Sequence, residues 1–179
     1  MNQLAIRCRF RRLPFDNASM VTDSYRPESK TIAFNALKGA CGTFLKDLKA
    51  LPDDAFEKKF GVATRTVADI VYEVNLVNDH VGMVMRLEEP FTWPDEQWIK
   101  APVGFGTKEI AIEAFEKSSE RILATVEAFT RDQIEKPLKT DEGETTRFER
   151  CRFMTLHLWY HSGQLNFIQT ILGDEVWHW

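Results

Sequence analysis

Four segments of the chain place apolar side chains at spacings of three and four residues, which is the period of an amphipathic α-helix. The second segment depends on valine, a middling helix former, so packing must sustain it more than intrinsic propensity does. Four such helices with little strand signal predict an all-α fold, a single antiparallel four-helix bundle. The segments cover about 27–48, 66–84, 108–129 and 148–172.

Proline and glycine mark the ends of the predicted bundle. Pro27 suits the first turn of a helix and Gly173 suits the position just past a helix end, so we place the bundle at 27–173. Residues 1–26 form a basic N-terminal extension that we expect to be disordered. Residues 174–179 form an aromatic C-terminal tail that is too apolar to hang free, so we expect it to dock on the bundle or on a second subunit.

Two connections between the helices have distinct compositions. The stretch 89–107 is rich in proline, glycine and aromatic residues, and loops of this length are usually functional or disordered. Its Trp93 and Trp98 either seal the open end of the bundle or line a pocket, and both interpretations stay open. The polar connector 136–146 is compatible with a short hairpin.

Composition limits the classes of partner. The net charge is −4, whereas nucleic-acid-binding domains are usually basic, so nucleic acid is an unfavoured partner. No apolar run approaches the roughly 20 residues that span a bilayer, which excludes a membrane-spanning protein. Cys8, Cys41 and Cys151 are an odd number without a C-x-x-C spacing, which fits a reducing cytoplasm rather than a disulfide framework. We expect Cys41 and Cys151 to be buried and inert.

The first residues carry an excess of arginine. Residues 1–19 hold four arginines against Asp16 alone, a charge of +3 that leaves −7 for the remainder of the chain. This stretch has no apolar core of a secretory signal. A disordered extension is the favoured interpretation, and a nucleic-acid-binding arm is the alternative. The lead-in at Met20 leaves open whether translation starts there or at Met1.

Two histidines stand one helical turn apart in the last segment. His161 occupies a position of the buried stripe where Met154, Leu158 and Leu165 predict an aliphatic residue, and His157 lies on the flank of that stripe. Residues four apart share one face of a helix, so their imidazoles can bind one divalent cation. The alternative is that each histidine is a hydrogen-bonded core residue, but this requires separate polar partners in an apolar interior.

The second segment offers two further ligands. Glu73 and His80 fall on the same flank of the valine stripe, but they lie about 10.5 Å apart along the helix axis. One compact site cannot easily use both, so one is the third ligand and the other lines the pocket or supports the site. A carboxylate would balance the charge of the ion, whereas His80 is equally suitable as a ligand. We expect the nearby Asn75, Asn78 and Asp79 to face solvent or a loop.

The pattern His157-x-x-x-His161-Ser-Gly-Gln164 resembles the His-x-x-x-His-Arg-Gly-Gln signature in the last helix of the DinB/YfiT-like metalloenzymes. The resemblance covers about 28–173. It implies a four-helix bundle, often dimeric, in which three ligands hold a divalent metal. The third ligand of that family is normally a histidine in the second helix, and Glu73 stands at that position here. Ser162 in place of the usual arginine is a second departure from the pattern.

The resemblance also implies a chemistry. Relatives resemble transferases and isomerases that use a low-molecular-weight thiol on a small electrophile, and others look like metal-dependent hydrolases. A non-catalytic bundle that binds a small ligand or a metal is the alternative from another class. Two imidazoles and a carboxylate with an open position form the ligand set of a catalytic zinc site, so zinc or nickel is the expected ion. We expect a homodimer, with Tyr160, Gln164, Trp93 and Trp98 lining the pocket or supporting the ligands.

Overall fold

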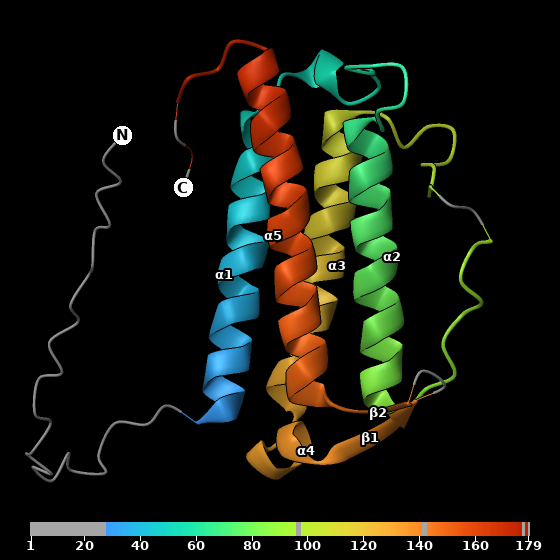
Figure 1. The fold of residues 1–179 in the computed structure, drawn as a ribbon, viewed down its shortest axis with the longest axis vertical. Helices are drawn as coiled ribbons and strands as arrows, with labels where there is room; N and C mark the ends of the chain where they lie inside the picture. The colour runs from blue at the N-terminus through green and yellow to red at the C-terminus, as the bar shows by residue number, and fades with distance from the viewer. Residues whose placement is uncertain (1–27, 96–97, 141–142, 177, 179) are drawn as a thin grey trace, which may run out of the picture.

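The four amphipathic segments form four long helices that pack side by side (Figure 1). The structure is a computed structural model, and it describes residues 28–95, 98–140, 143–176 and 178. The predicted four-helix bundle is confirmed. Its long helices are α1 (Ser29–Ala50), α2 (Val67–Arg86), α3 (Lys108–Ala128) and α5 (Arg147–Ile171).

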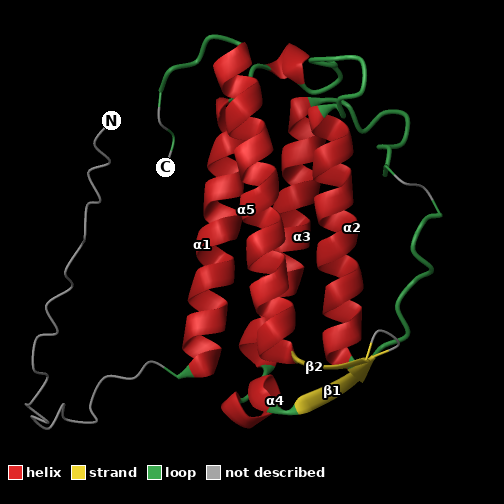
Figure 2. Ribbon diagram, in the orientation of Figure 1, coloured by secondary structure: helices red, strands yellow, loops and turns green. Residues whose placement is uncertain are grey.

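Short elements join the long helices at the two ends of the bundle (Figure 2). The 3-10 helix η1 (Asp53–Ala55) lies between α1 and α2, and α4 (Arg131–Glu135) follows α3. Strands β1 (Pro137–Thr140) and β2 (Gly143–Thr146) pair antiparallel, with Pro137 opposite Thr146, so the hairpin considered for this connector is present. Sequence periodicity gave no signal for α4, because one turn of helix is shorter than the pattern that reveals it.

Neighbouring helices α2 and α3 run parallel rather than antiparallel. Asn78 donates to Ser118 and Arg86 donates to Thr125, so residue numbers increase in the same direction along both helices. The connection 87–107 makes this possible because it returns the chain along the outside of the bundle (Figure 1). The described residues of that connection form no helix or strand, as predicted. Long crossovers of this kind are known variants of the four-helix bundle.

The antiparallel prediction holds for α1 and α3. Lys30 donates to the carbonyl of Glu127, whereas Lys49, near the other end of α1, pairs with Glu116. Helices α1 and α5 therefore run one way and α2 and α3 the other (Figure 1). The direction of each helix was not encoded in its periodicity, which is the same in either direction.

The predicted apolar stripes form one core. The rings of Phe44 and Phe115 meet with centroids 4.7 Å apart between α1 and α3. The apolar stripe of the first segment is buried throughout, at Ala33, Leu37, Ala40, Phe44 and Leu48. Cys41 and Cys151 are buried as predicted, and burial raises the pKa of both thiols to about 12. The largest fully buried side chains are Phe44, Phe56, Phe115, Leu37, Leu48, Leu51, Met85, Ile122, Ile134, Met154, Leu158 and Leu165.

The N-terminus of α2 is fixed by a capping box. The Asp69 amide donates to Thr66 Oγ1, and the Thr66 amide donates to Asp69 Oδ2, each at 3.1 Å. The second carboxylate oxygen of Asp69 accepts from the Ala101 amide at 2.8 Å. One side chain therefore begins the helix and also holds the crossover 87–107 against it.

Some predictions concern residues that the structure does not describe. The extension 1–26, with both candidate start residues, lies outside the described residues, as do Trp177 and Trp179 of the aromatic tail. Within the described residues, no helix combines the length and the apolar character needed to cross a membrane.

A buried acid links α1 to α5. Asp47 is completely buried, and Ser162 donates to its Oδ2, while Oδ1 has no hydrogen-bond partner among the described residues. Gln169 Nε2 donates to the Asp47 carbonyl at 2.9 Å. Burial raises the pKa of the Asp47 carboxyl, although hydrogen bonds from Ser162 and Asn166 oppose the shift. Folding therefore shifts this acid toward its protonated form.

We expect Asp47→Asn to raise the free energy of unfolding, relative to the wild type, by more at neutral pH than at acid pH. The folded-state pKa lies above the unfolded value, so the wild type loses stability as the pH rises through the folded-state pKa, and the neutral amide does not. The stability advantage of the variant should grow between about pH 4 and pH 7. The growth should be about 1.4 kcal/mol for each pH unit between the two pKa values.

Urea denaturation at the two pH values measures this difference. The exposed Asp54→Asn serves as the matched control and should show no such growth. An equal advantage of Asp47→Asn at both pH values would contradict the prediction.

Candidate metal centre

The antiparallel contact between α2 and α5 brings a carboxylate to two imidazoles. At one end of this contact, Arg147 Nε donates to the Met85 carbonyl at 2.8 Å. Further along it, Glu73 Oε1 lies 3.6 Å from His157 Nε2 and 3.7 Å from His161 Nε2. The two Nε2 atoms lie 3.1 Å apart. No other group of three or more His, Cys, Asp or Glu side chains comes this close within the described part of the chain.

The spacing of these three atoms fits a small divalent ion. Ligands at about 2.0–2.1 Å from a tetrahedral ion lie about 3.3 Å from one another, and the observed separations bracket that value. Glu73 and His157 are partly buried and His161 is almost fully buried. The donor set, two nitrogens and one oxygen, is one that zinc and its first-row neighbours accept.

His161 is oriented by a neighbour on its own helix. Its Nδ1 lies 2.8 Å from Gln164 Oε1, and because that oxygen can only accept, Nδ1 carries the proton. The Nε2 of a neutral His161 then presents its lone pair toward His157 and Glu73. The Nε2 atom of His157 lies 3.1 Å from this nitrogen, and an incoming ion would replace the proton between the two rings.

Burial and charge set the protonation of the cluster. Burial lowers the pKa of His157, and the contact with Glu73 opposes this only in part, so the imidazole favours its neutral form. Burial acts on Glu73 in the other direction and would raise its pKa. The contacts with His157 and His161 and the charge of Arg65 outweigh burial, so the pKa of Glu73 lies well below its usual range. The cluster thus combines an ionised carboxylate with a neutral imidazole, which are the forms that bind metal.

Arg65 holds the outer oxygen of the carboxylate, and sequence reasoning missed it. Its Nη2 contacts Glu73 Oε2 and donates to the Asp69 carbonyl at 3.0 Å. The indole of Trp98 lies against the guanidinium, 5.5 Å from ring centroid to Cζ. Arg65 precedes the helix cap, outside any periodic pattern, so only its position next to Thr66 could have drawn attention to it.

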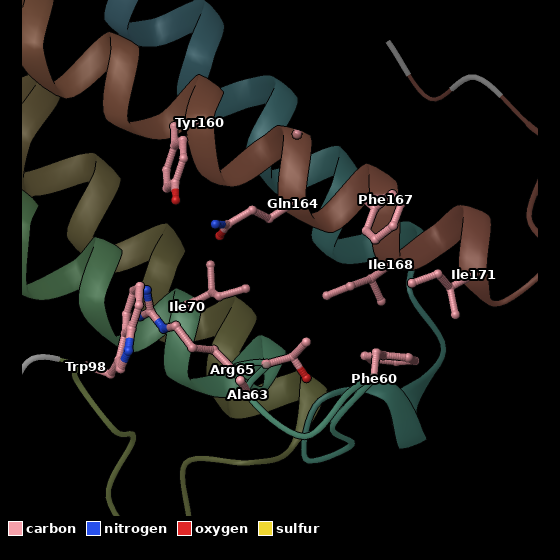
Figure 3. A pocket seen from close by; sticks show the side chains of 12 residues that line it. Phe60, Ala63, Arg65, Ile70, Trp98, Tyr160, Gln164, Phe167, Ile168 and Ile171 are labelled. Atoms are coloured by element: carbon pink, nitrogen blue, oxygen red, sulfur yellow. The ribbon is translucent and has the colours of Figure 1, made fainter.

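A pocket of about 430 Å³ is lined by Arg65, Gln164 and Tyr160, each of which contacts a residue of the cluster (Figure 3). Three residues that we predicted to line a pocket or support the ligands, Tyr160, Gln164 and Trp98, are part of its wall. The ring of Tyr160 meets His161 edge-on, with centroids 4.9 Å apart. Gln164 connects the pocket wall to the candidate ligand His161 through its hydrogen bond.

His80 and Trp93 lie in a different place. They line a second pocket, of about 740 Å³, together with Phe91 and Arg150. The His80 ring packs edge-on against Phe91 and Trp93, with centroids 5.2 and 5.6 Å away. The structure therefore brings Glu73, and not His80, to the two histidines of α5.

Gln164→Leu should weaken metal binding, because it removes the acceptor that fixes the proton on His161 Nδ1. Loss of such a supporting residue typically lowers metal affinity roughly 10–100-fold. Gln164→Glu is the matched variant, because its carboxylate accepts the same proton and should preserve affinity. Competition with a chromophoric chelator measures both. Equal affinity of Gln164→Leu and the wild type would show that Gln164 has no part in orienting the ligand.

Comparisons with known proteins agree with this architecture. The fold resembles the crystal structure of a conserved protein from Enterococcus faecalis, with a TM-score of 0.63 and 12% sequence identity, over 83% of this chain and 99% of that one. Identity this low indicates a shared fold and nothing more. No curated protein matches the sequence. The family model of the DinB superfamily matches residues 36–165, which include Glu73, His157 and His161. The chain therefore belongs to the DinB superfamily.

Proposed function

We propose that the protein is a metal-dependent enzyme that acts on a small electrophile with a low-molecular-weight thiol as cosubstrate. The observation that carries this proposal is the Glu73–His157–His161 cluster beside a pocket of about 430 Å³. Pockets of roughly 300–1,000 Å³ hold small molecules. With three protein ligands, a bound zinc or nickel ion keeps one position open and favours the deprotonated form of a thiol or of water.

The surrounding residues have separate tasks in this proposal. Gln164 fixes the proton on His161 and thereby the direction of its lone pair. Arg65 holds one oxygen of Glu73 and leaves the other directed at the histidines. The apolar pocket wall excludes water from a bound electrophile, which limits its loss by hydrolysis. A purely structural metal site would not need an adjoining pocket, and this favours an enzyme over a bundle in which the metal serves stability alone.

We further propose that the protein is cytoplasmic and forms a homodimer. Two buried cysteine thiols without a disulfide fit a reducing cytoplasm. A homodimer is supported by α5, whose outer face exposes several large apolar side chains, since contiguous apolar surface usually marks an interface. Phe153 and Leu156 lie outside the 430 Å³ pocket, and Tyr160, Phe167 and Ile171 lie at its rim.

Metal analysis of the natively purified protein tests the site directly. We expect about one equivalent of zinc or nickel, which the double variant His157→Ala/His161→Ala should lose. Glu73→Gln should weaken binding by more than the roughly 10–100-fold expected for a supporting residue. His80→Ala, on the same helix but in the other pocket, is the matched control and should bind as the wild type does.

Activity and folding should respond differently to metal removal. Chelation should abolish thiol-dependent turnover in a panel of electrophiles while leaving most of the helical circular dichroism, because the bundle core does not include the ion. Turnover without any thiol would indicate a hydrolase instead. A double histidine variant that binds metal as tightly as the wild type would remove the basis of the proposal.

Light scattering tests the dimer. At micromolar concentration we expect about twice the chain mass of 20.7 kDa. Leu156→Glu places a charge on the exposed face of α5 and should shift the protein to the monomer. Val62→Glu, at a fully exposed site between α1 and α2, is the control and should stay dimeric. A monomeric wild type would contradict the prediction.

A further inference from the structure

A second pocket, of about 740 Å³, lies between α2, the start of α5 and the crossover that joins α2 to α3. Along α2 the two pockets flank the cluster, because Ile70 lines the first pocket, Glu73 belongs to the cluster and Val77 lines the second pocket. Phe153, in the wall of the second pocket, stacks on His157 with ring centroids 5.9 Å apart. A molecule in the second pocket therefore lies next to the cluster, on the side away from the first pocket.

One wall of the second pocket is aromatic. Phe91 and Trp93 come from the crossover, and their rings are nearly parallel, with an interplanar angle of 19° and centroids 6.3 Å apart. The His80 ring meets both of them edge-on. Trp93 is 38% exposed, so part of its ring is open to a ligand. Aromatic rings attract one another beyond the gain from burying their area, so this wall favours a flat aromatic molecule over an aliphatic one of equal size.

His80 gives this wall a polar atom that a ligand can reach. Its Nδ1 is buried and has no hydrogen-bond partner among the described residues. Its Nε2 makes no hydrogen bond within the described chain either, but it is not buried. A proton on Nδ1 would be a buried donor without an acceptor, so the neutral imidazole places its proton on Nε2. That N–H is able to donate to an oxygen of a ligand.

The rest of the wall sets the size and the general character of the ligand. The valines of α2 make one side apolar, at Val77, Val81 and Val84. Arg150 Nη2 donates to Thr140 Oγ1 at 3.2 Å, so these two polar residues of the wall are bonded to each other. Pockets of roughly 300–1,000 Å³ hold small molecules, and a few polar groups in a mostly apolar wall orient them. The fitting ligand is a small, largely apolar molecule.

We propose that the second pocket binds a small aromatic molecule whose ring carries an oxygen, as in a phenol. The ring lies against Phe91 and Trp93, and the oxygen accepts a hydrogen bond from His80 Nε2. This binding site goes beyond the proposed function and does not depend on it, because it requires neither the metal ion nor a thiol.

Three probes of similar shape separate the parts of the inference: p-cresol, p-xylene and 4-methylcyclohexanol. NMR titration of the Trp93 indole N–H, assigned with the variant Trp93→Phe, gives the dissociation constant of each probe. We expect p-cresol to shift this signal in a saturable way. The indole of Trp98, in the first pocket, should not respond at the concentration that half-saturates Trp93. A response to p-cresol at Trp98 alone, or at neither indole, would overturn the inference.

His80→Phe tests the hydrogen bond, because it keeps a ring in the wall and removes both nitrogens. It should lower the affinity for p-cresol relative to p-xylene roughly 2–10-fold, which corresponds to one hydrogen bond. Tyr160→Phe, the matched control, removes a polar atom from a ring of the first pocket and should leave the affinity ratio unchanged. An unchanged ratio in His80→Phe would overturn the assignment of the oxygen to His80.

Phe91→Leu tests the aromatic wall. It should lower the affinity for p-cresol relative to 4-methylcyclohexanol roughly 2–10-fold, because a contact between two aromatic rings is lost. Phe167→Leu removes a ring from the wall of the first pocket and serves as the matched control, with an unchanged ratio. A ratio that stays the same in Phe91→Leu would contradict the preference for an aromatic ligand.

Repeating the titrations with chelator-treated protein separates this inference from the proposed function. We expect p-cresol to bind as before. Loss of this binding together with the metal would mean that the ion, and not His80, binds the oxygen, and the inference would fail. A protein that takes up no metal but still binds p-cresol through His80 would leave the inference standing and remove the proposed metal chemistry.

Discussion

The charge of Glu73 is the constraint around which the α2–α5 contact is organised. A carboxylate placed between helices has to be neutralised or compensated, and here Arg65 contacts one oxygen while two imidazoles surround the other. The same compensation fixes the direction of the carboxylate. The guanidinium is in turn covered by Trp98, which the Ala101–Asp69 hydrogen bond helps to keep near the start of α2. The site, the crossover and the helix cap thus depend on one another.

The parts of the fold that depend on local pattern could be predicted from the sequence. Each long helix buries one stripe, and the stripe is visible as period 3.6 whatever it packs against. The Thr66 cap is local too. The burial of His161 followed from its place in a stripe that is otherwise aliphatic. The family signature added the expectation that this histidine and His157 serve one site.

The parts that depend on which helices meet could not be predicted. The relative direction of α2 and α3 depends on the path of the crossover. Asn75 and Asn78 were expected to face solvent or a loop, but both are buried, and Asn78 donates to Ser118 of α3. The choice between Glu73 and His80 was open for the same reason, since both occupy one flank of α2 and only the position of α5 separates them.

The order of the helices along the chain has a consequence for biosynthesis. The helix that fills the space between α1 and α2 is the last one to leave the ribosome, and it supplies two of the three candidate ligands (Figure 1). Until it arrives, Glu73 has no imidazole opposite it and the apolar faces of α1 and α2 lack a cover. Contacts this distant in sequence form late, because the long loop between them must close first. A nascent or truncated chain that ends before α5 therefore has neither a complete core nor a complete metal centre.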